Sequence, residues 1–188
     1  SISNKRKRCE EMTQVLLVVD VQNDYFPGGK MVLKETERAL AATIKMVTGF
    51  KERHLPIIYI QHIKESPHAD FFARGTSGAR LHKDLGVPTD ALIVKKHYPN
   101  SFIGTNLGAL LKELEAKQVV ITGMMTHMCI DSTTRASSEL GLQPVLISDA
   151  TATRDLVFDG RVVQADQVSD SFLAALANFA QVISAEDF

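Results

Sequence analysis

Short apolar runs alternate with longer amphipathic stretches along the chain from residue 14 onward. Six of the apolar runs have the length and the β-branched content of buried strands. We predict these strands at residues 15–19, 57–61, 91–94, 119–121, 144–148 and 181–184. Four of the stretches between them repeat apolar side chains at the spacing of one helix face. We predict these helices at residues 35–53, 105–117, 128–140 and 161–179.

The order of these elements predicts the fold class. Strands that are apolar along nearly their whole length and alternate with helices form parallel sheets that helices cover on both faces. We therefore predict an α/β protein, a three-layer α/β/α sandwich with a six-stranded, parallel, Rossmann-like sheet. No internal repeat or linker interrupts residues 14–188, so we predict a single domain there. Residues 62–90 have no regular period and are predicted to form a long loop, which in a compact domain is usually functional.

The composition narrows the classes of function. A net charge of −1 gives no field that would favour nucleic acid or anionic lipid. We see no apolar run of membrane-spanning length and no secretory signal pattern, and therefore expect a cytoplasmic protein. The two cysteines form no disulfide framework or zinc cluster. Residues 1–13, which include the charged run SISNKRKRCEE, are predicted to be an N-terminal tail of native or recombinant origin, with Cys9 as a bystander.

Residues with possible chemistry lie where predicted strands end. Asp20, Lys96 and Asp149 follow three of the apolar runs, and Cys129 opens the helix after the fourth strand. Parallel sheets bind ligands beyond the carboxyl ends of their strands, so we expect these residues near one edge. At the N-terminus of a helix the thiol of Cys129 should ionise more readily than a free thiol.

Each of these residues also has a purely structural interpretation. Cys129 could be a small buried apolar residue, Asp20 a carboxylate that caps the following loop, and Lys96 a solvated lysine. Taken together, however, a thiol at a helix terminus with an acid and a base near it fits nucleophilic acyl transfer. A non-enzymatic redox sensor needs only an accessible thiol of low pKa, so Asp20 and Lys96 argue against that alternative.

The segments around these positions resemble one known family. VVDVQNDYF around Asp20, VKKHYPNSF around Lys96 and ITGMMTHMCIDSTTRAS around Cys129 are similar to motifs of the isochorismatase-like cysteine hydrolases. The segment SDATAT at residues 148–153 also fits. This family includes nicotinamidases, N-carbamoylsarcosine amidase and isochorismatase, and the resemblance extends from residue 15 to the C-terminus.

The resemblance implies a reaction and a role for each residue. The catalytic triad would be Asp20, Lys96 and Cys129, because the family's lysine stands six residues before a phenylalanine, here Phe102, which excludes Lys95. Cys129 would attack the carbonyl carbon of a small amide or carbamoyl substrate and form an acyl-thioester, Asp20 would accept the thiol proton, and Lys96 would orient the pair. The alternative within the family is isochorismatase-type cleavage of a vinyl ether, with Asp20 as the acid.

The resemblance also implies the surroundings of the reacting sulfur. The backbone N–H groups of Met125 and Cys129 would form the oxyanion hole, and the peptide bond between Met124 and Met125 would be cis. Phe26 and Phe102 follow two of the motifs closely and could line the substrate pocket, or they could belong to the core.

Some residues depart from the family pattern. Nicotinamidases carry a metal-binding Asp and His pair just after the second strand, where this chain has Gln61, His62, Ile63 and Lys64. Without a neighbouring carboxylate, His62 and His68 are more typical of loop or pocket residues than of a zinc site. We therefore expect no metal and no cofactor, and nicotinamidase activity is disfavoured. The resemblance further implies a homo-oligomer, a dimer or tetramer, that acts on a small-molecule substrate without nucleic acid or membrane.

Overall fold

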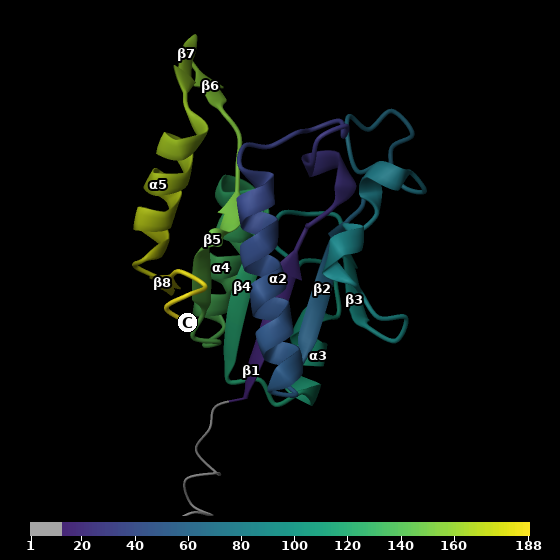
Figure 1. Ribbon diagram of the computed structural model, residues 1–188, viewed down its shortest axis with the longest axis vertical. Coiled ribbons are helices and arrows are strands. Elements are labelled where there is room, and N and C mark those ends of the chain that lie inside the picture. Colours follow the sequence, from purple (N-terminus) through teal and green to yellow (C-terminus); the bar gives the residue numbers. More distant parts are fainter. Residues whose placement is uncertain (1–12) are drawn as a thin grey trace, which may run out of the picture.

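The computed structural model describes residues 13–188, so the predicted tail up to residue 12, with Cys9, lies outside the described residues. In the described part, six parallel strands form one sheet in the order β3-β2-β1-β4-β5-β8 (Figure 1). The strands are β1 (Gln14–Val19), β2 (Ile57–His62), β3 (Leu92–Lys96), β4 (Gln118–Met124), β5 (Val145–Ala152) and β8 (Gln181–Ile183). The predicted α/β fold with a six-stranded parallel sheet is confirmed.

Four helices cover the sheet: α2 (Thr36–Glu52), α3 (Leu107–Glu113), α4 (Asp131–Glu139) and α5 (Ala165–Leu176). Helix α2 lies over one face, and the other three helices lie over the opposite face (Figure 1). Side chains of β1 alternate between the two cores, since Leu16 and Val18 lie beneath α2 while Val15 and Leu17 lie on the other side. Burial on both faces explains why this strand is apolar at every position after Gln14.

The predicted helix at residues 161–179 is wrong at its N-terminal end. Strands β6 (Leu156–Phe158) and β7 (Arg161–Val163) form an antiparallel hairpin there, and α5 begins only at Ala165. Asp159 and Gly160 connect the two strands with φ values of 51° and 74°. Two-residue hairpin turns need this left-handed conformation, and Asp-Gly is one of the sequences that adopt it most readily.

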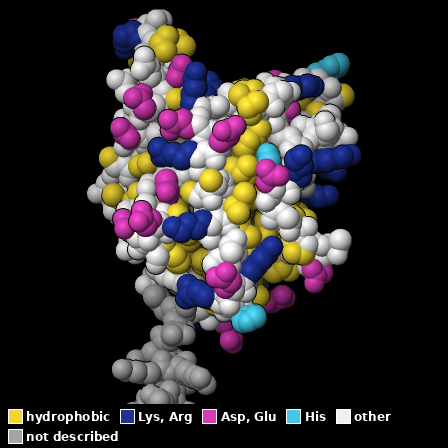
Figure 2. Space-filling model, viewed as in Figure 1, with side chains coloured by type: hydrophobic (Ala, Val, Ile, Leu, Met, Phe, Trp, Pro, Cys, Tyr) yellow, Lys and Arg dark blue, Asp and Glu magenta, His cyan; other side chains and the backbone are white. Residues whose placement is uncertain are grey.

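The hairpin projects beyond the end of the sheet (Figure 1). Its side chains Val157, Phe158 and Val162 are largely exposed. Figure 2 shows apolar side chains at this tip, while basic and acidic side chains are interspersed over the rest of the same face. This face therefore has no extended patch of a single charge.

Two predictions near the carboxyl ends of β4 and β5 also need correction. A π-helical turn, η4 (Thr126–Ile130), precedes α4, so the regular helix starts later than predicted. Strand β5 continues to Ala152, and Asp149 therefore lies within the strand rather than at its end. The Asp149 carboxylate accepts a hydrogen bond from the N–H of Ala185 at 2.9 Å, which gives Asp149 a structural role.

Between β2 and β3 the chain forms the long loop that the sequence predicts. The loop contains only two short 3-10 turns, η2 (Ser77–Ala79) and η3 (Lys83–Leu85). A third such turn, η1 (Asn23–Tyr25), follows β1. No helix within residues 13–188 is long and apolar enough to cross a membrane.

Candidate active site

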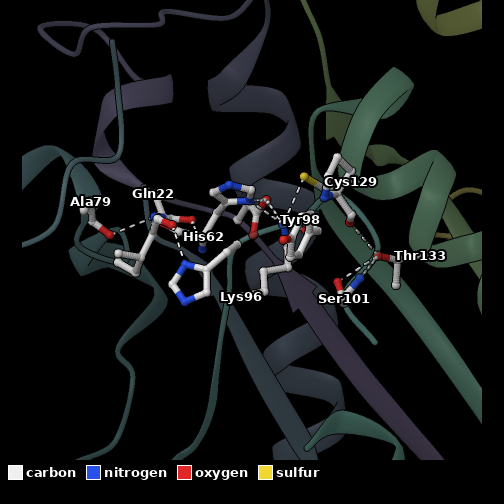
Figure 3. Close-up of polar contacts among 12 residues, drawn as sticks. Gln22, His62, Ala79, Lys96, Tyr98, Ser101, Cys129 and Thr133 are labelled. Atoms are coloured by element: carbon white, nitrogen blue, oxygen red, sulfur yellow. Dashed lines mark hydrogen bonds and ion pairs between the residues drawn. The ribbon is translucent and has the colours of Figure 1, made fainter. Parts of the chain in front are cut away.

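Three strands of the sheet bring Asp20, Lys96 and Cys129 to one edge. Asp20 directly follows β1, Lys96 is the last residue of β3, and Cys129 lies in η4 after β4. The Lys96 Nζ is 3.0 Å from Asp20 Oδ2 and 3.1 Å from Cys129 Sγ. Figure 3 shows the lysine side chain lying between His62 and Cys129. The three residues therefore meet at the carboxyl ends of the strands, where sheets of this class bind ligands.

The position of Asp20 depends on a close approach between β1 and β4. Asp20 has a φ of 54°, and its N–H donates to the carbonyl oxygen of Ile60 at 3.0 Å. A Cβ atom on Gly123 of β4 would lie only 1.8 Å from the carbonyl oxygen of Val19. Glycine is therefore required at position 123 if the two strands are to stay side by side up to Asp20.

The Asp20 carboxylate is fully buried and has unused acceptor capacity. Apart from the ion pair with Lys96, neither of its oxygens has a hydrogen-bond partner among the described residues. A buried carboxylate without donors is costly unless a nearby cation balances its charge. Lys96 supplies that cation, and the free lone pairs leave Asp20 able to accept a proton.

The side chain of Lys96 is completely buried and has four partners. Besides Asp20 and Cys129, its ammonium contacts His62 Nδ1 at 2.7 Å and donates to the carbonyl oxygen of Tyr98 at 3.0 Å. Burial by itself would lower the pKa of Lys96, but Asp20 and the Cys129 sulfur outweigh burial, and the pKa is raised. Lys96 therefore remains an ammonium at neutral pH.

The prediction that Cys129 ionises readily is wrong. The residue lies in the π-helical turn before α4, and its side chain is almost completely buried. Burial raises the pKa of the thiol far above its ordinary value, the Asp20 carboxylate raises it further, and Lys96 opposes only part of this effect. The resting site therefore holds a neutral thiol beside the Asp20–Lys96 ion pair.

Helix α4 is anchored to the loop that follows β3. The hydroxyl oxygens of Ser101 and Thr133 are 2.7 Å apart, and the N–H of Ser101 donates to Thr133 Oγ1 at 3.2 Å (Figure 3). Both side chains are buried. Because Cys129 precedes Thr133 by about one helical turn, these bonds help to hold the sulfur near Lys96.

His62 also belongs to the site, whereas the sequence indicated only a loop or pocket residue. It is the last residue of β2, which lies between β1 and β3 in the sheet. Its Nδ1 lies 2.7 Å from Lys96 Nζ and 3.9 Å from Asp20 Oδ2. Burial lowers the pKa of His62 to about 4, and Lys96 adds to this shift, so the imidazole is neutral at neutral pH. Its place at a strand end was the only signal in the sequence.

The composition of this cluster raises the question of a metal. One ligand atom from each of Asp20, His62 and Cys129 lies within 4.8 Å of the other two, which is a set that could hold an ion. However, the ammonium of Lys96 lies 2.7, 3.0 and 3.1 Å from His62, Asp20 and Cys129. A divalent ion among them would meet this buried ammonium at short range, where like charges repel strongly. The residues therefore fit a cluster centred on the lysine and do not fit a metal site.

The turn before Cys129 contains the cis peptide bond that the family resemblance implies. The peptide bond between Met124 and Met125 is cis. The carbonyl oxygen of Met125 accepts hydrogen bonds from the N–H groups of Met128 and Ile130 at 3.0 and 3.3 Å. These bonds close the turn on the N-terminal side of Cys129.

The remaining candidate residues have different surroundings. Phe26 is buried in the core beneath α2, whereas Phe102 packs against the opposite core, which includes Cys129. Of the two aromatic candidates, Phe102 is therefore the one on the same side of the sheet as the sulfur.

Comparison with known proteins identifies the family. Residues 14–187 match the isochorismatase domain. YddQ of Bacillus subtilis, named as an uncharacterized isochorismatase family protein, is 40% identical over 178 residues, which are 94% of this chain and 99% of YddQ. The crystal structure of a protein from Oleispira antarctica, described as an isochorismatase hydrolase, has a TM-score of 0.90 at 40% identity and covers 94% of this chain and 96% of that one.

Relatives that are named for an activity are more distant. Streptothricin hydrolase from Streptomyces noursei is 30% identical over 88% of this chain and 56% of its own length. Nicotinamidase from Acinetobacter baylyi is 27% identical over 75% of this chain and 82% of its own length. The domain match and the high identity to YddQ each cover nearly the whole chain. The chain therefore belongs to the isochorismatase family of cysteine hydrolases.

Proposed function

We propose that this protein cleaves the C–N bond of a small amide or carbamoyl substrate through an acyl-thioester on Cys129. The main observation behind the proposal is that one buried ammonium contacts both Asp20 and Cys129, at 3.0 and 3.1 Å. A thiol, a carboxylate with free acceptor sites and a cation together supply a nucleophile, a base and charge balance.

In the first step the Cys129 thiol transfers its proton to Asp20 while the sulfur attacks the carbonyl carbon. Because the pKa of the thiol is raised by burial, the sulfur is not ionised in advance, and proton transfer has to accompany the attack. Lys96 stays close to the negative charge as it moves from the carboxylate through the sulfur to the substrate oxygen. The N–H groups of Met125 and Cys129 donate to that oxygen in the tetrahedral intermediate.

Collapse of the intermediate breaks the C–N bond. The leaving nitrogen takes the proton from Asp20, so the amine departs neutral and Asp20 becomes a carboxylate again. Water then attacks the thioester carbon and gives a proton to Asp20. When the C–S bond breaks, the sulfur recovers this proton, which releases the acid and restores the thiol.

The relatives agree with this chemistry. One of them is named as a nicotinamidase, which denotes hydrolysis of an amide, and another as a hydrolase of streptothricin. By the family resemblance, nicotinamidases carry their metal-binding Asp and His just after the second strand, where this chain has Gln61, His62, Ile63 and Lys64. Here His62 contacts Lys96. We therefore propose amide hydrolysis in which a lysine, rather than a metal, supplies the positive charge at this place.

Turnover of a substrate panel tests the proposal. The panel contains small primary amides, carbamoyl amines and isochorismate, and the readouts are released ammonia or amine and pyruvate. We expect hydrolysis of at least one amide or carbamoyl compound by the native protein and none by Cys129→Ala. Pyruvate release from isochorismate without any amide turnover, retained in Cys129→Ala, would show vinyl ether cleavage and contradict the proposal.

A further inference from the structure

We propose that His62 is a positioning residue, which holds the Lys96 ammonium between Asp20 and Cys129 by accepting one of its N–H bonds. The inference rests on the proposed function and adds a residue to it. The short distance of 2.7 Å between His62 Nδ1 and Lys96 Nζ is the first observation. An ammonium can only donate hydrogen bonds, so Nδ1 must be the bare nitrogen and Nε2 must carry the proton.

His62 is itself held by the buried side chain of Gln22. The Gln22 amide donates to the His62 carbonyl oxygen at 2.9 Å and accepts from the His62 N–H at 2.9 Å. The same amide nitrogen donates to the Ala79 carbonyl oxygen at 2.8 Å (Figure 3). Both backbone groups of His62 are thus tied to the loop after β1 and to the long loop before β3. This bracing fixes the backbone from which the imidazole reaches Lys96.

Burial, together with the charged groups around it, keeps the imidazole of His62 neutral. Burial, Lys96, Lys64 and His97 lower the pKa of His62. Asp20 raises this pKa, but its effect is smaller than that of burial and the cations together. If His62 were protonated, two cations would face each other at the contact distance of 2.7 Å. The neutral state is therefore the one that can bind the ammonium.

The ammonium has three N–H bonds and four neighbours, Asp20, His62, Tyr98 and Cys129. Two of these neighbours, Asp20 and Cys129, change their charge during the proposed reaction, while His62 and the carbonyl oxygen of Tyr98 do not. Because the charge of His62 and of the Tyr98 carbonyl oxygen stays constant, these two acceptors can hold the ammonium in place while charge passes between Asp20 and Cys129. Loss of His62 should therefore affect the chemical step more than substrate binding.

Substitution of His62 tests this role in the full-length protein. His62→Leu removes the acceptor and should lower kcat on the order of 100-fold with little change in KM. His62→Asn offers an amide oxygen near the position of Nδ1 and should restore kcat to within about 5-fold of the native value. The matched control is His68→Leu, because His68 borders the same surface hollow of about 550 Å³ without belonging to the cluster. Equal activity of His62→Leu and the native protein would overturn the proposal.

A second measurement does not depend on turnover. Nitrogen-15 NMR of the imidazole should show the Nε2–H tautomer of His62 and no protonation between pH 8 and about 5. In Lys96→Met the cation is gone and Asp20 remains, so the pKa of His62 should rise. An Nδ1–H tautomer, or a pKa that does not respond to Lys96→Met, would overturn the contact. If the NMR results hold and no amide is hydrolysed, the proposed function fails while the contact stands.

Discussion

Two buried carboxylates, Asp20 and Asp24, lie close together in the sequence and are balanced in different ways. Asp24 accepts backbone N–H bonds from Lys30 at 3.1 Å and from Phe72 at 2.8 Å, one on each oxygen. Asp20 has no such bonds and depends on Lys96. Backbone donors stabilise the ionised form and occupy its lone pairs, whereas an ion pair leaves lone pairs open to a proton. The comparison separates a carboxylate that backbone donors hold from one that the proposed mechanism uses as a base.

The surroundings of Asp24 agree with a structural role. A Cβ atom on Gly78 would lie 2.1 Å from Asp24 Oδ1, and one on Gly29 would lie 2.4 Å from the Asp24 carbonyl oxygen. These glycines allow two loops to close around the carboxylate. Asp24 therefore joins the loop after β1 to the long loop after β2.

The largest expected effect is the difference in activity between the Asp20→Asn and Asp24→Asn variants. Asp20→Asn should lower kcat/KM by about 10³-fold or more, because the proton acceptor is lost, and Cys129→Ala should lower it at least as much. Asp24→Asn should remain within about 10-fold of the native protein. The measurement is steady-state turnover of an amide substrate, with circular dichroism as the control for folding. Full activity of Asp20→Asn would remove Asp20 from the mechanism.

Lowering the pH should reduce the free energy of unfolding, because the buried His62 resists protonation in the folded protein. The pKa of His62 is lowered from 6.5 to about 4 by burial and by Lys96, so the unfolded chain binds this proton at a higher pH than the folded protein. Stability is therefore complete above about pH 6.5 and falls as the pH drops towards 4, by on the order of 3 kcal/mol. Urea unfolding at pH 7 and pH 4.5 measures this loss. The His62→Asn variant should lose less stability between these two pH values than the native protein. An equal loss in the variant and the native protein would contradict the lowered pKa of His62.

Asp24→Asn should reduce stability rather than chemistry. The amide has only one acceptor oxygen, so a backbone N–H of Lys30 or Phe72 would face an NH₂ group. Leaving a buried donor unsatisfied costs about 1–3 kcal/mol in the free energy of unfolding. Denaturant titration of the variant measures this cost, and an unchanged midpoint would show that the two bonds contribute nothing.

The rate at which Cys129 is alkylated should change when Asp20 is substituted and stay the same when Asp24 is substituted. Asp20 raises the pKa of the thiol and Lys96 lowers it, so Asp20→Asn leaves a sulfur that ionises more easily. At pH 7 the rate of reaction with iodoacetamide should increase about 10-fold in this variant and decrease in Lys96→Met. Asp24→Asn serves as the control and should not alter the rate. Slower alkylation in Asp20→Asn would contradict the inference that Asp20 raises the pKa of the thiol.

The smallest expected effect is that of metal removal. Because the Lys96 ammonium lies among the atoms that could hold an ion, prolonged treatment with a chelator should leave turnover unchanged. Recovery of lost activity on addition of zinc, iron or manganese would contradict the lysine-centred cluster.

Much of the fold could be predicted from the sequence because six apolar runs and the periodic stretches between them are long enough to show their period. The hairpin of β6 and β7 could not, since strands of three residues are too short for alternation to be seen. Their apolar residues also continue the helical spacing of α5. The Asp159-Gly160 turn was the available signal, and it lies directly before the stretch 161–179 that was assigned to the helix.

The sequence could predict that Asp20, Lys96 and Cys129 lie together, but it could not predict their electrostatics. Asp20, Lys96 and Cys129 could be grouped because parallel strands end at one edge, and the family resemblance selects Lys96 over Lys95. The contact between His62 and Lys96 depends on the register of β2 against its neighbours, which sequence does not reveal. The pKa of the thiol was predicted with the wrong sign because the effect of a helix terminus was considered without burial.

Trapping with hydroxylamine tests the acyl-thioester on Cys129 most directly. Hydroxylamine competes with water for a thioester and converts the acyl group to a hydroxamate, while the release of amine continues. With an amide that the native protein hydrolyses, we expect hydroxamate in proportion to the hydroxylamine added, and none with Cys129→Ala. Formation of the free acid alone, at every hydroxylamine concentration, would contradict an acyl-enzyme on Cys129.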